Sequence, residues 1–536
     1  MSERLDRLAP LVAAAVAVAV LAAALLFGSR TASGADSLGY VSQAYLWREG
    51  SLHVRHPLAG GVPWPHAQLV ATPLGFRFAD AGTVVPTYPA GVPLIMAGAL
   101  AIVGACGPYL VVPLFGGLLV WMTYVLGRRL SESRVTGALA ALLMASSPAF
   151  LFNVMWPMSD TVTAALWTAS LATVSRPGRR AAMGGGLLAG AAILARPNLV
   201  PLAGAGALAA LVWPGSTVRD GDWRRAGLYV LAGVVPAALA VALLNDALYG
   251  SPFLSGYGPT RSLYSPSFLS GNLANYGQAL GRSEAIVLWL LALPLLPALR
   301  PARRPDRPSA APAILGAGIV FFSYLFYLPF AEWWYLRFLL PAFPLLFIAM
   351  AAGLVQVLAR ASGRALRAAV GAFVLLAIVL RVDFASRHRA FSVGAGEGRY
   401  RAVAAFVDRA LPPSAVLLSM QHSGSLWFYS GRPTLRYDFL TPERLPSAIA
   451  WLHDRGLRPY IVLDASEEAA FTDRFRSAGR LGQLDLRVIG EMRTPVPVRI
   501  FDATVPANEQ EQAFQIQPAA RACDAPSPSW LNAIGR

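Results

Sequence analysis

Three carboxylates stand at the edges of long apolar runs, where a membrane would meet water. Asp36 follows the first run, Asp160 begins a later one, and Glu332 directly precedes another. An ionisable side chain at that depth is costly and is a functional candidate by default. Each carboxylate could accept a proton from a substrate hydroxyl. Two alternatives stay open, because Asp160 or Ser159 could be a plain helix N-cap and Glu332 could be a solvated loop residue.

Two arginines stand at the same boundary. Arg196 ends one apolar run, and Arg337 opens another. A guanidinium group binds phosphate bidentately and keeps its charge, so both side chains could hold a lipid phosphate. The alternative is that they only reach toward the head groups of bulk lipid. The aromatic residues 333–335 are typical of an interface anchor.

The histidines and cysteines provide weaker evidence for a functional site than the carboxylates and arginines. His53, His56 and His66 form no i, i+4 ligand pair, so a zinc site is unsupported and we expect solvated loop histidines. Two cysteines, Cys106 and Cys523, exclude a disulfide scaffold and a cysteine-based metal site. They could pair with each other if both are extracytoplasmic, but we expect independent thiols.

The composition identifies the surroundings of these side chains. Of 536 residues, 55% are hydrophobic and 14% are charged, a balance typical of polytopic membrane proteins and not of soluble domains. The net charge of +16 would suggest nucleic acid in a soluble protein. Here it reflects basic cytoplasmic loops, so no nucleic-acid partner is expected. The chain contains no Lys, so every basic side chain is Arg.

Apolar runs of sufficient length predict about 11 transmembrane helices. The predicted spans are residues 10–27, 109–127, 135–151, 160–175, 181–195, 199–213, 226–244, 284–299, 313–330, 337–358 and 366–382. The first run is longer than a signal-peptide core, and we expect it to be retained. Arginine clusters follow alternate spans, which places the N-terminus in the cytoplasm. Another apolar segment, 89–105, should lie in the outer interface, because a further crossing would put Arg128 and Arg129 outside.

The polar parts of the chain are expected outside the cell membrane. Residues 29–108 would form a large first outer loop. Short apolar runs at 415–419, 460–463 and 498–501 predict strands, with helices at 400–410 and 442–455 between them. The expected domains are a membrane module, an extracytoplasmic α/β domain and a disordered tail, over residues 1–384, 385–505 and 506–536.

Several motifs, by their order in the chain and the side of the membrane on which they are predicted, resemble those of the integral-membrane glycosyltransferases of the GT-C fold. The resemblance is to bacterial relatives of protein O-mannosyltransferases and of the aminoarabinose transferase of lipid A, a group like glycosyltransferase family 39. The motifs that carry the resemblance, over residues 1 to about 382, are 36–40 (Asp-Ser-Leu-Gly-Tyr), 87–94 (Thr-Tyr-Pro-Ala-Gly-Val-Pro-Leu), 158–160 (Met-Ser-Asp), 195–197 (Ala-Arg-Pro), 248–252 (Leu-Tyr-Gly-Ser-Pro) and 334–341 (Trp-Tyr-Leu-Arg-Phe-Leu-Leu-Pro).

The resemblance implies a mostly α, polytopic protein of the inner membrane with a small C-terminal extracytoplasmic α/β domain. It implies a hexosyl- or pentosyltransferase that uses a polyprenyl-phosphate-linked sugar on the outer face. By position, Asp36 matches the first catalytic acidic residue of the group, Asp160 the second, and Glu332 a possible third.

A glycosyl phosphate already has a good leaving group, so the reaction needs a base for the acceptor and cations for the phosphate. We expect Asp36 to be the base, with Arg196 and Arg337 as donor-phosphate ligands. Tyr40 and Tyr88 are the expected substrate-loop residues. In-line attack by a hydroxyl predicts inversion. The acceptor (glycan, lipid or protein) stays open.

The role of Asp160 also stays open. It could orient Asp36 or the acceptor, or it could help to hold a divalent cation. Oxygen ligands would suit Mg²⁺ or Mn²⁺, and the metal itself is undetermined.

Two alternatives to an enzyme remain. A transporter or flippase of a lipid-linked precursor could use the same carboxylates as ion sites, although we find no internal repeat and no charge near the middle of a span. A non-catalytic scaffold would keep working without the Asp36 carboxylate, so Asp36→Asn separates it from an enzyme.

Overall fold

The chain is mostly helical and divides into two compact units. The computed structural model describes residues 3–80, 82–213, 223–284, 311–360, 363–507, 512–518 and 528–533. The first unit, here called the helical unit, contains Met1–Gly28, Pro89–Val92 and Leu110–Phe391. The second, here called the α/β unit, contains Ser29–Tyr88, Pro93–Tyr109 and Ser392–Arg536.

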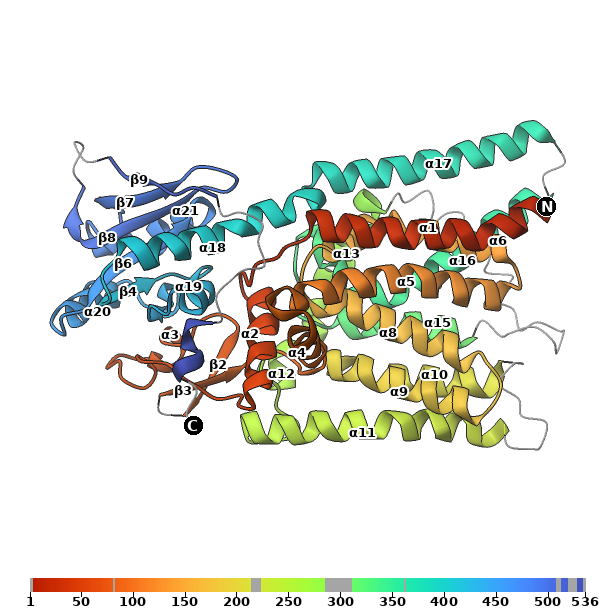
Figure 1. The fold of residues 1–536 in the computed structure, drawn as a ribbon, viewed down its shortest axis with the longest axis horizontal. Coiled ribbons are helices and arrows are strands. Elements are labelled where there is room, and N and C mark those ends of the chain that lie inside the picture. The colour runs from red at the N-terminus through yellow and green to blue at the C-terminus, as the bar shows by residue number, and fades with distance from the viewer. Residues whose placement is uncertain are drawn as a thin grey trace. The chain divides into compact units, whose positions relative to one another are not determined.

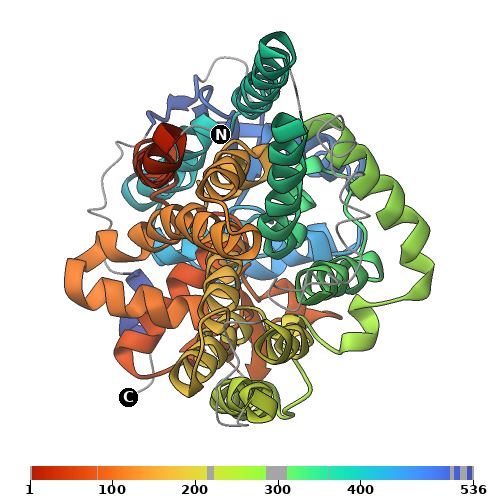
Figure 2. The same cartoon turned by 90° about the vertical axis from the view of Figure 1, so that its right-hand side faces the viewer.

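Long apolar helices lie side by side in the helical unit, as both views show (Figures 1 and 2). Its longer helices are α1 (Glu3–Phe27), α5 (Gly107–Ser131), α6 (Arg134–Ala145), α8 (Ser159–Val174), α9 (Arg179–Ala195), α10 (Leu202–Val212), α11 (Trp223–Tyr249), α13 (Leu269–Ser283), α15 (Ala311–Leu325), α16 (Phe343–Arg360) and α17 (Arg364–Arg387). Short elements join them: α7 (Pro148–Asn153), η2 (Pro197–Leu199), α12 (Thr260–Leu263), η4 (Pro266–Phe268), η6 (Trp333–Ala342) and η7 (Ala390–Ser392). Helix α9 packs against α8 and α11, and α6 packs against α1 and α16.

Within the part of the chain that the structure describes, five helical stretches are long and apolar enough to cross a membrane, so the chain is a multi-pass membrane protein. They are Glu3–Phe27, Gly91–Ser131, Arg225–Tyr249, Trp333–Ala359 and Arg364–Arg387. Three further apolar helices, Arg134–Ala145, Pro197–Val212 and Ala311–Leu325, are shorter. Each predicted span within the described residues overlaps a helix or two consecutive helical elements. The span predicted at 313–330 is too long, because α15 ends at Leu325. The span predicted at 284–299 lies outside the described residues after Glu284.

The span predicted at 135–151 is broken into α6 and α7. Helix α6 ends at Ala145, with Ser146 as its C-cap. Ser147 is the N-cap of α7, and its Oγ accepts a hydrogen bond from the Phe150 N–H at 3.3 Å. Pro148 takes the first helical position, where its missing N–H costs nothing. The segment expected in the interface forms α4 (Gly91–Val103), which the 3₁₀ turn η1 (Gly104–Cys106) separates from α5. Its position in the membrane stays a prediction.

A six-stranded sheet forms the centre of the α/β unit, in the order β5-β4-β6-β8-β7-β9. Its strands are β4 (Ala415–Leu418), β5 (Thr434–Leu435), β6 (Arg458–Asp464), β7 (Leu486–Met492), β8 (Val498–Pro506) and β9 (Phe514–Gln515). The helical elements between and beside them are α18 (Val393–Ala410), α19 (Ser423–Ser430), η8 (Tyr437–Phe439), α20 (Arg444–His453), α21 (Ala465–Arg474) and η9 (Arg476–Ala478). Strand β4 is parallel to β5 and β6, whereas β8 is antiparallel to β6 and β7. The predicted α/β domain, with strands at β4, β6 and β8, is therefore confirmed.

The sheet is covered on both faces, because successive residues of a strand point to opposite faces and here join two different apolar clusters. Val416 and Leu418 of β4 join one apolar cluster, and Ala415 and Leu417 join another. Because both faces are buried, these strands read as continuous apolar runs in the sequence.

Most of the first outer loop, which we expected in the membrane module, groups with the α/β unit, and only Pro89–Val92 groups with the helical unit. It forms α2 (Asp36–Glu49), β1 (Val54–Arg55), α3 (Ala67–Val70), β2 (Phe76–Asp80) and β3 (Thr83–Pro86), with a small antiparallel sheet in the order β1-β3-β2. Trp64 and Val70 lie in the same apolar cluster as Leu418. The Arg436 N–H donates to the Val70 carbonyl at 2.7 Å. The loop is thus part of the fold of the C-terminal domain.

Part of residues 506–536, where we expected disorder, has defined structure. Strand β9 pairs with β7, and Ser529–Ala533 forms the 3₁₀ helix η10. Trp530 is buried, with its ring 5.8 Å from that of Trp427. Scattered apolar residues among Ala, Pro and Gln make these segments pack, which composition alone does not reveal. Cys106 is disulfide-bonded, so the expected free thiol is wrong there; Cys523 lies outside the described residues.

Candidate active site

The acidic stretch around Asp36 forms the first turn of α2. Asp36 is half-buried, and the N-cap residue Ala35 makes no side-chain cap. The first turn of a helix stabilises a carboxylate through the helix dipole. The Tyr88 hydroxyl donates a hydrogen bond of 2.7 Å to Asp36 Oδ1. This places one of the two expected substrate-loop tyrosines on the expected base.

The ring of Tyr88 packs against α2 at Gly39. A Cβ atom on Gly39 would come within 2.2 Å of that ring, so only glycine permits this approach. The Tyr88 ring also contacts Tyr40, at 4.8 Å between centroids. Within the α/β unit, the structure therefore brings together the predicted residues Asp36, Tyr40 and Tyr88.

A second group of predicted residues meets in the helical unit. Asp160 is in the first turn of α8, and Arg196 is the residue that ends α9. Arg196 precedes Pro197 and is extended, with φ −146° and ψ 90°, as the residue before proline prefers. This geometry places Arg196 Nη2 2.9 Å from Asp160 Oδ1. Met158 is the N-cap of α8, so the alternative that Ser159 or Asp160 is the cap is wrong.

Arg196 and Arg337 contact the same aromatic ring. Each guanidinium carbon lies 5.3 Å from the centroid of Phe338. Arg337 belongs to η6, and its Nη1 donates to Met158 Sδ at 3.2 Å. Two guanidinium groups thus lie at one ring, and the Asp160 carboxylate pairs with one of them. Such a set of positive groups can attract an anionic ligand such as a phosphate.

Tyr324 and Asn198 complete this cluster and were missed by sequence reasoning. The Tyr324 hydroxyl accepts hydrogen bonds from Arg196 Nη1 at 3.1 Å and from Asn198 Nδ2 at 2.9 Å. The Tyr324 ring stacks on Phe338, with an angle of 6° between the ring planes. The sequence signal that could have indicated Tyr324 is its polar hydroxyl within the apolar run at 313–330.

Glu332, the possible third acidic residue, does not join this group through any ion pair among the described residues. It is exposed and directly precedes η6. The solvated-loop alternative accounts for this placement. Phe152 packs against Trp333 and Trp334, with ring centroids 5.3 and 5.8 Å apart, so part of this aromatic group packs on protein.

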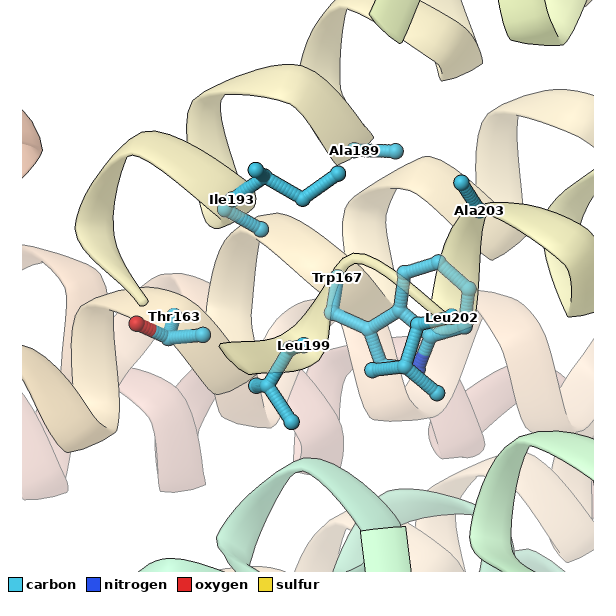
Figure 3. Close-up of a pocket in the computed structure, with 8 residues that line it drawn as sticks. Thr163, Trp167, Ala189, Ile193, Leu199, Leu202 and Ala203 are labelled. Atoms are coloured by element: carbon cyan, nitrogen blue, oxygen red, sulfur yellow. The ribbon is translucent and has the colours of Figure 1, made fainter. Parts of the chain in front are cut away.

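A small cavity lies between α8, α9 and α10 (Figure 3). Its volume is about 10 Å³, the room of one water molecule at most. Thr163, Trp167 and Ile193 are among the residues that line it, and the lining is mainly apolar. This cavity is too small and too apolar for a sugar or a phosphate.

The three histidines differ in environment. His53 and His66 are exposed, as expected, but His56 is buried with its ring 4.9 Å from that of Trp427. Burial lowers the pKa of His56 to about 3, which keeps the imidazole neutral. Its neighbour Trp427 is over 350 positions away, which explains the failure of sequence reasoning. Among the described residues, no three His, Cys, Asp or Glu side chains gather as a metal site.

A buried ion pair lies in the helical unit outside the predicted site. Arg381 Nε donates to Glu284 Oε2 at 3.1 Å, and neither side chain is exposed. The Ser147 hydroxyl donates to Glu284 at 2.6 Å. Arg381 stands near the end of the predicted span 366–382. Nothing in the neighbouring sequence indicates Glu284 as its partner.

The chain has the fold of the GT-C membrane glycosyltransferases, as its likeness to solved structures shows. ArnT from Cupriavidus metallidurans, bound to undecaprenyl phosphate, is 15% identical, with a TM-score of 0.55 over 93% of this chain and 99% of that one. No family model and no curated protein matches the sequence.

Two further structures share the fold. The archaeal oligosaccharyltransferase AglB from Archaeoglobus fulgidus, in complex with an inhibitory peptide and a dolichol-phosphate, is 12% identical, with a TM-score of 0.53 over 92% of this chain and 75% of that one. The arabinofuranosyltransferase AftD from Mycobacteria is 16% identical, with a TM-score of 0.50 over 95% of this chain and 42% of that one.

Proposed function

We propose that this protein is a membrane glycosyltransferase that moves a sugar from a polyprenyl-phosphate-sugar donor to an extracytoplasmic acceptor, with inversion. The observation that carries the proposal is the convergence of Arg196 and Arg337 on Phe338 beside Asp160. Two neighbours of the same fold contain undecaprenyl phosphate and dolichol-phosphate, the lipids that such a donor would release. We place the protein in the inner membrane, with the N-terminus cytoplasmic and the α/β unit extracytoplasmic.

The proposed chemistry is a single displacement. The acceptor hydroxyl oxygen bonds to the anomeric carbon, and the bond from that carbon to the phosphate oxygen breaks. The hydroxyl proton passes to the Asp36 carboxylate, and the electron pair of the broken bond leaves on polyprenyl phosphate. One displacement at the anomeric carbon inverts its configuration, so a retained product would contradict this scheme.

The residues around Asp36 and the residues around Phe338 have different roles in this reaction. Asp36 is the base, and the Tyr88 hydroxyl that donates to Asp36 Oδ1 at 2.7 Å orients the carboxylate. Arg196 and Arg337 bind the departing phosphate, whose charge grows as the bond breaks. The Tyr324 hydroxyl accepts from Arg196 and orients it, and Asn198 donates to the same hydroxyl.

A divalent cation is not assigned to any step. Asp160 already has a cationic partner in Arg196, and the described residues form no metal-ligand cluster. One structure of the archaeal neighbour contains zinc and sulfate. Measuring transfer by the purified protein after chelation and after re-addition of Mg²⁺ or Mn²⁺ tests whether a metal takes part.

The experiment that tests the function is release of free polyprenyl phosphate. Purified protein in lipid vesicles is given a panel of polyprenyl-phosphate sugars with crude envelope extract as acceptor. Release by the wild type that is lost in Asp36→Asn, while donor binding persists, supports glycosyl transfer and the assigned base. Translocation of the lipid across the bilayer without release would replace the proposal with a flippase.

A further inference from the structure

Helix α19 of the C-terminal domain contacts the helix that begins with Asp36. Leu38, two residues after Asp36, is fully buried. A Cβ atom on Gly424 of α19 would lie 1.8 Å from Leu38 Cδ2 and 2.5 Å from the Leu74 carbonyl oxygen. The second of these atoms belongs to the backbone and cannot rotate away. Only glycine at position 424 therefore allows α19 to approach α2 this closely.

Hydrogen bonds from α19 reinforce this contact. The Tyr429 hydroxyl accepts the Ala32 N–H at 2.7 Å, four residues before Asp36. The Ser423 hydroxyl accepts the Leu74 N–H at 3.1 Å, on the chain segment that also contacts Gly424. The acidic stretch is thus held by α19 at Ala32 before Asp36 and at Leu38 after it.

Helix α19 is itself a rigid support. Its residues Trp427 and Phe428 are almost fully buried. His422, which directly precedes it, is buried and bonds through Nε2 to Asp464 at 2.8 Å. Asp464 also accepts two bonds from Arg399 Nε and one from Nη2. Burial opposes the charge on Asp464, but His422 and Arg399 outweigh it, so the pKa of Asp464 lies well below its usual range.

We propose that Gly424 and Tyr429 are positioning residues for Asp36, through which the C-terminal domain sets the geometry of the catalytic base. This inference rests on the proposed function, because it assigns these residues to the same transfer. It also gives the domain a task other than acceptor binding. A base must be held within a fraction of an ångström of its productive position, and a support of buried side chains provides this.

The test compares Gly424→Ala with Gly396→Ala in the full-length protein in lipid vesicles. Gly396 lies on α18 of the same unit, where an added Cβ would meet only Val496, at an ordinary distance of 4.0 Å. Gly424→Ala should lower kcat for polyprenyl-phosphate release, on the order of 10²-fold for a displacement near 1 Å. The KM for the donor and donor binding should be unchanged. Gly396→Ala should behave as the wild type.

Combination with Asp36→Asn separates positioning from general damage. When the base is already absent, Gly424→Ala should lower the residual rate no further. A full additional loss in the double variant would overturn the proposal. Tyr429→Phe removes one hydroxyl and keeps the ring, so it should fold even if Gly424→Ala does not, with a smaller loss of kcat.

A readout without activity keeps this inference distinct from the proposed function. Backbone hydrogen exchange over residues 36–46 should be faster in Gly424→Ala and Tyr429→Phe than in the wild type and in Gly396→Ala. If exchange is faster in Gly424→Ala and Tyr429→Phe but the wild type has no transferase activity, the proposed function is refuted. The inference that α19 supports α2 would still stand. Equal exchange in all four proteins would overturn the inference itself.

Discussion

The Asp160 carboxylate and the Arg196 guanidinium form an ion pair at 2.9 Å in which only 3% and 13% of the side chains are exposed. Removing one partner of so buried a pair would destabilise the protein, because the remaining charge would be left poorly solvated. The loss of activity in such a variant could therefore not be separated from the loss of stability. Variants that keep the charge are therefore the informative ones. Such variants test whether the geometry of the guanidinium group matters, while a positive charge is retained.

Arg196→Lys should weaken donor binding while the protein stays folded. Lysine keeps the positive charge for Asp160 but loses the planar fork that binds a phosphate through two parallel bonds. We expect the KM for the donor to rise on the order of tenfold, about 1.4 kcal/mol, with a smaller change in kcat. Steady-state release of polyprenyl phosphate measures both constants.

Arg180→Lys is the matched control, because Arg180 is exposed at the other end of the same helix, α9. It should leave the KM unchanged. A donor KM that is the same in Arg196→Lys, Arg180→Lys and the wild type would remove Arg196 from the phosphate site.

Tyr88→Phe should lower kcat and leave donor binding intact. The ring still fits against Gly39 and Tyr40, but Asp36 loses the hydroxyl that donates to it at 2.7 Å. A hydrogen bond to a charged group contributes about 1.5–3 kcal/mol, so a loss between about tenfold and about 100-fold is expected. Initial rates at saturating donor measure it.

Tyr45→Phe controls for this change on the same helix, since the Tyr45 ring packs on Phe428 and should tolerate the loss of a hydroxyl. The double variant Asp36→Asn with Tyr88→Phe should be no slower than Asp36→Asn alone. A further drop in the double variant would mean that Tyr88 acts independently of Asp36.

The helices could be predicted, and candidate site residues could be selected, because the signals for both are local. An apolar run of sufficient length is helical in a membrane wherever its neighbours lie, and arginine before proline ends a helix. Asp36, Asp160, Arg196 and Arg337 stand out because an ionisable side chain at the predicted outer edge of an apolar run is a functional candidate. Each could be selected without knowing what it touches.

The partners of these residues could not be predicted because they come from distant parts of the chain. Tyr324 meets Arg196 across 128 positions, and Gly424 meets Leu38 across a still larger separation. Nothing in a Ser-Gly-Ser stretch before an aromatic run indicates that its glycine touches another helix. For the same reason the first outer loop was assigned to the membrane module, although it folds with the C-terminal domain.

The buried pair of Glu284 and Arg381 gives a prediction about stability. Glu284 accepts hydrogen bonds from Arg381, from the Ser147 hydroxyl at 2.6 Å and from the Ala149 N–H at 3.3 Å. Glu284→Gln leaves the guanidinium buried without a counter-charge, so it should lower the free energy of unfolding by about 3–5 kcal/mol. Thermal unfolding of the protein in detergent measures the loss.

Two comparisons make this test specific. Asp383→Asn breaks an exposed pair with Arg387 on the same helix, α17, and should cost less than about 1 kcal/mol. Replacing both members of the buried pair, by Glu284→Gln with Arg381→Met, should restore much of the stability, because no unpaired charge remains. Equal losses in Glu284→Gln and Asp383→Asn would show that the buried pair is not a structural link.

His56 predicts a dependence of stability on pH. In the folded protein burial lowers the pKa of His56 to about 3, whereas an unfolded histidine has a pKa of about 6.5. Between these values the unfolded state binds more protons, so stability rises with pH there. The contribution is fully present above about pH 6.5 and is lost as the pH falls toward 3, with a slope of up to about 1.4 kcal/mol per pH unit.

Unfolding of the α/β unit, followed by tryptophan fluorescence between pH 7 and pH 4, measures this slope, because Trp427 packs on the His56 ring. Asp464 also loses stabilisation in acid, since its pKa is held down in the folded state, so the wild-type slope alone is not diagnostic. The difference between the wild type and His56→Phe isolates the histidine, and it should be largest between pH 6 and pH 4. His53→Gln, at an exposed position, should keep the wild-type slope. A His56→Phe protein with an unchanged slope would mean that the imidazole is already solvated when the unit is folded.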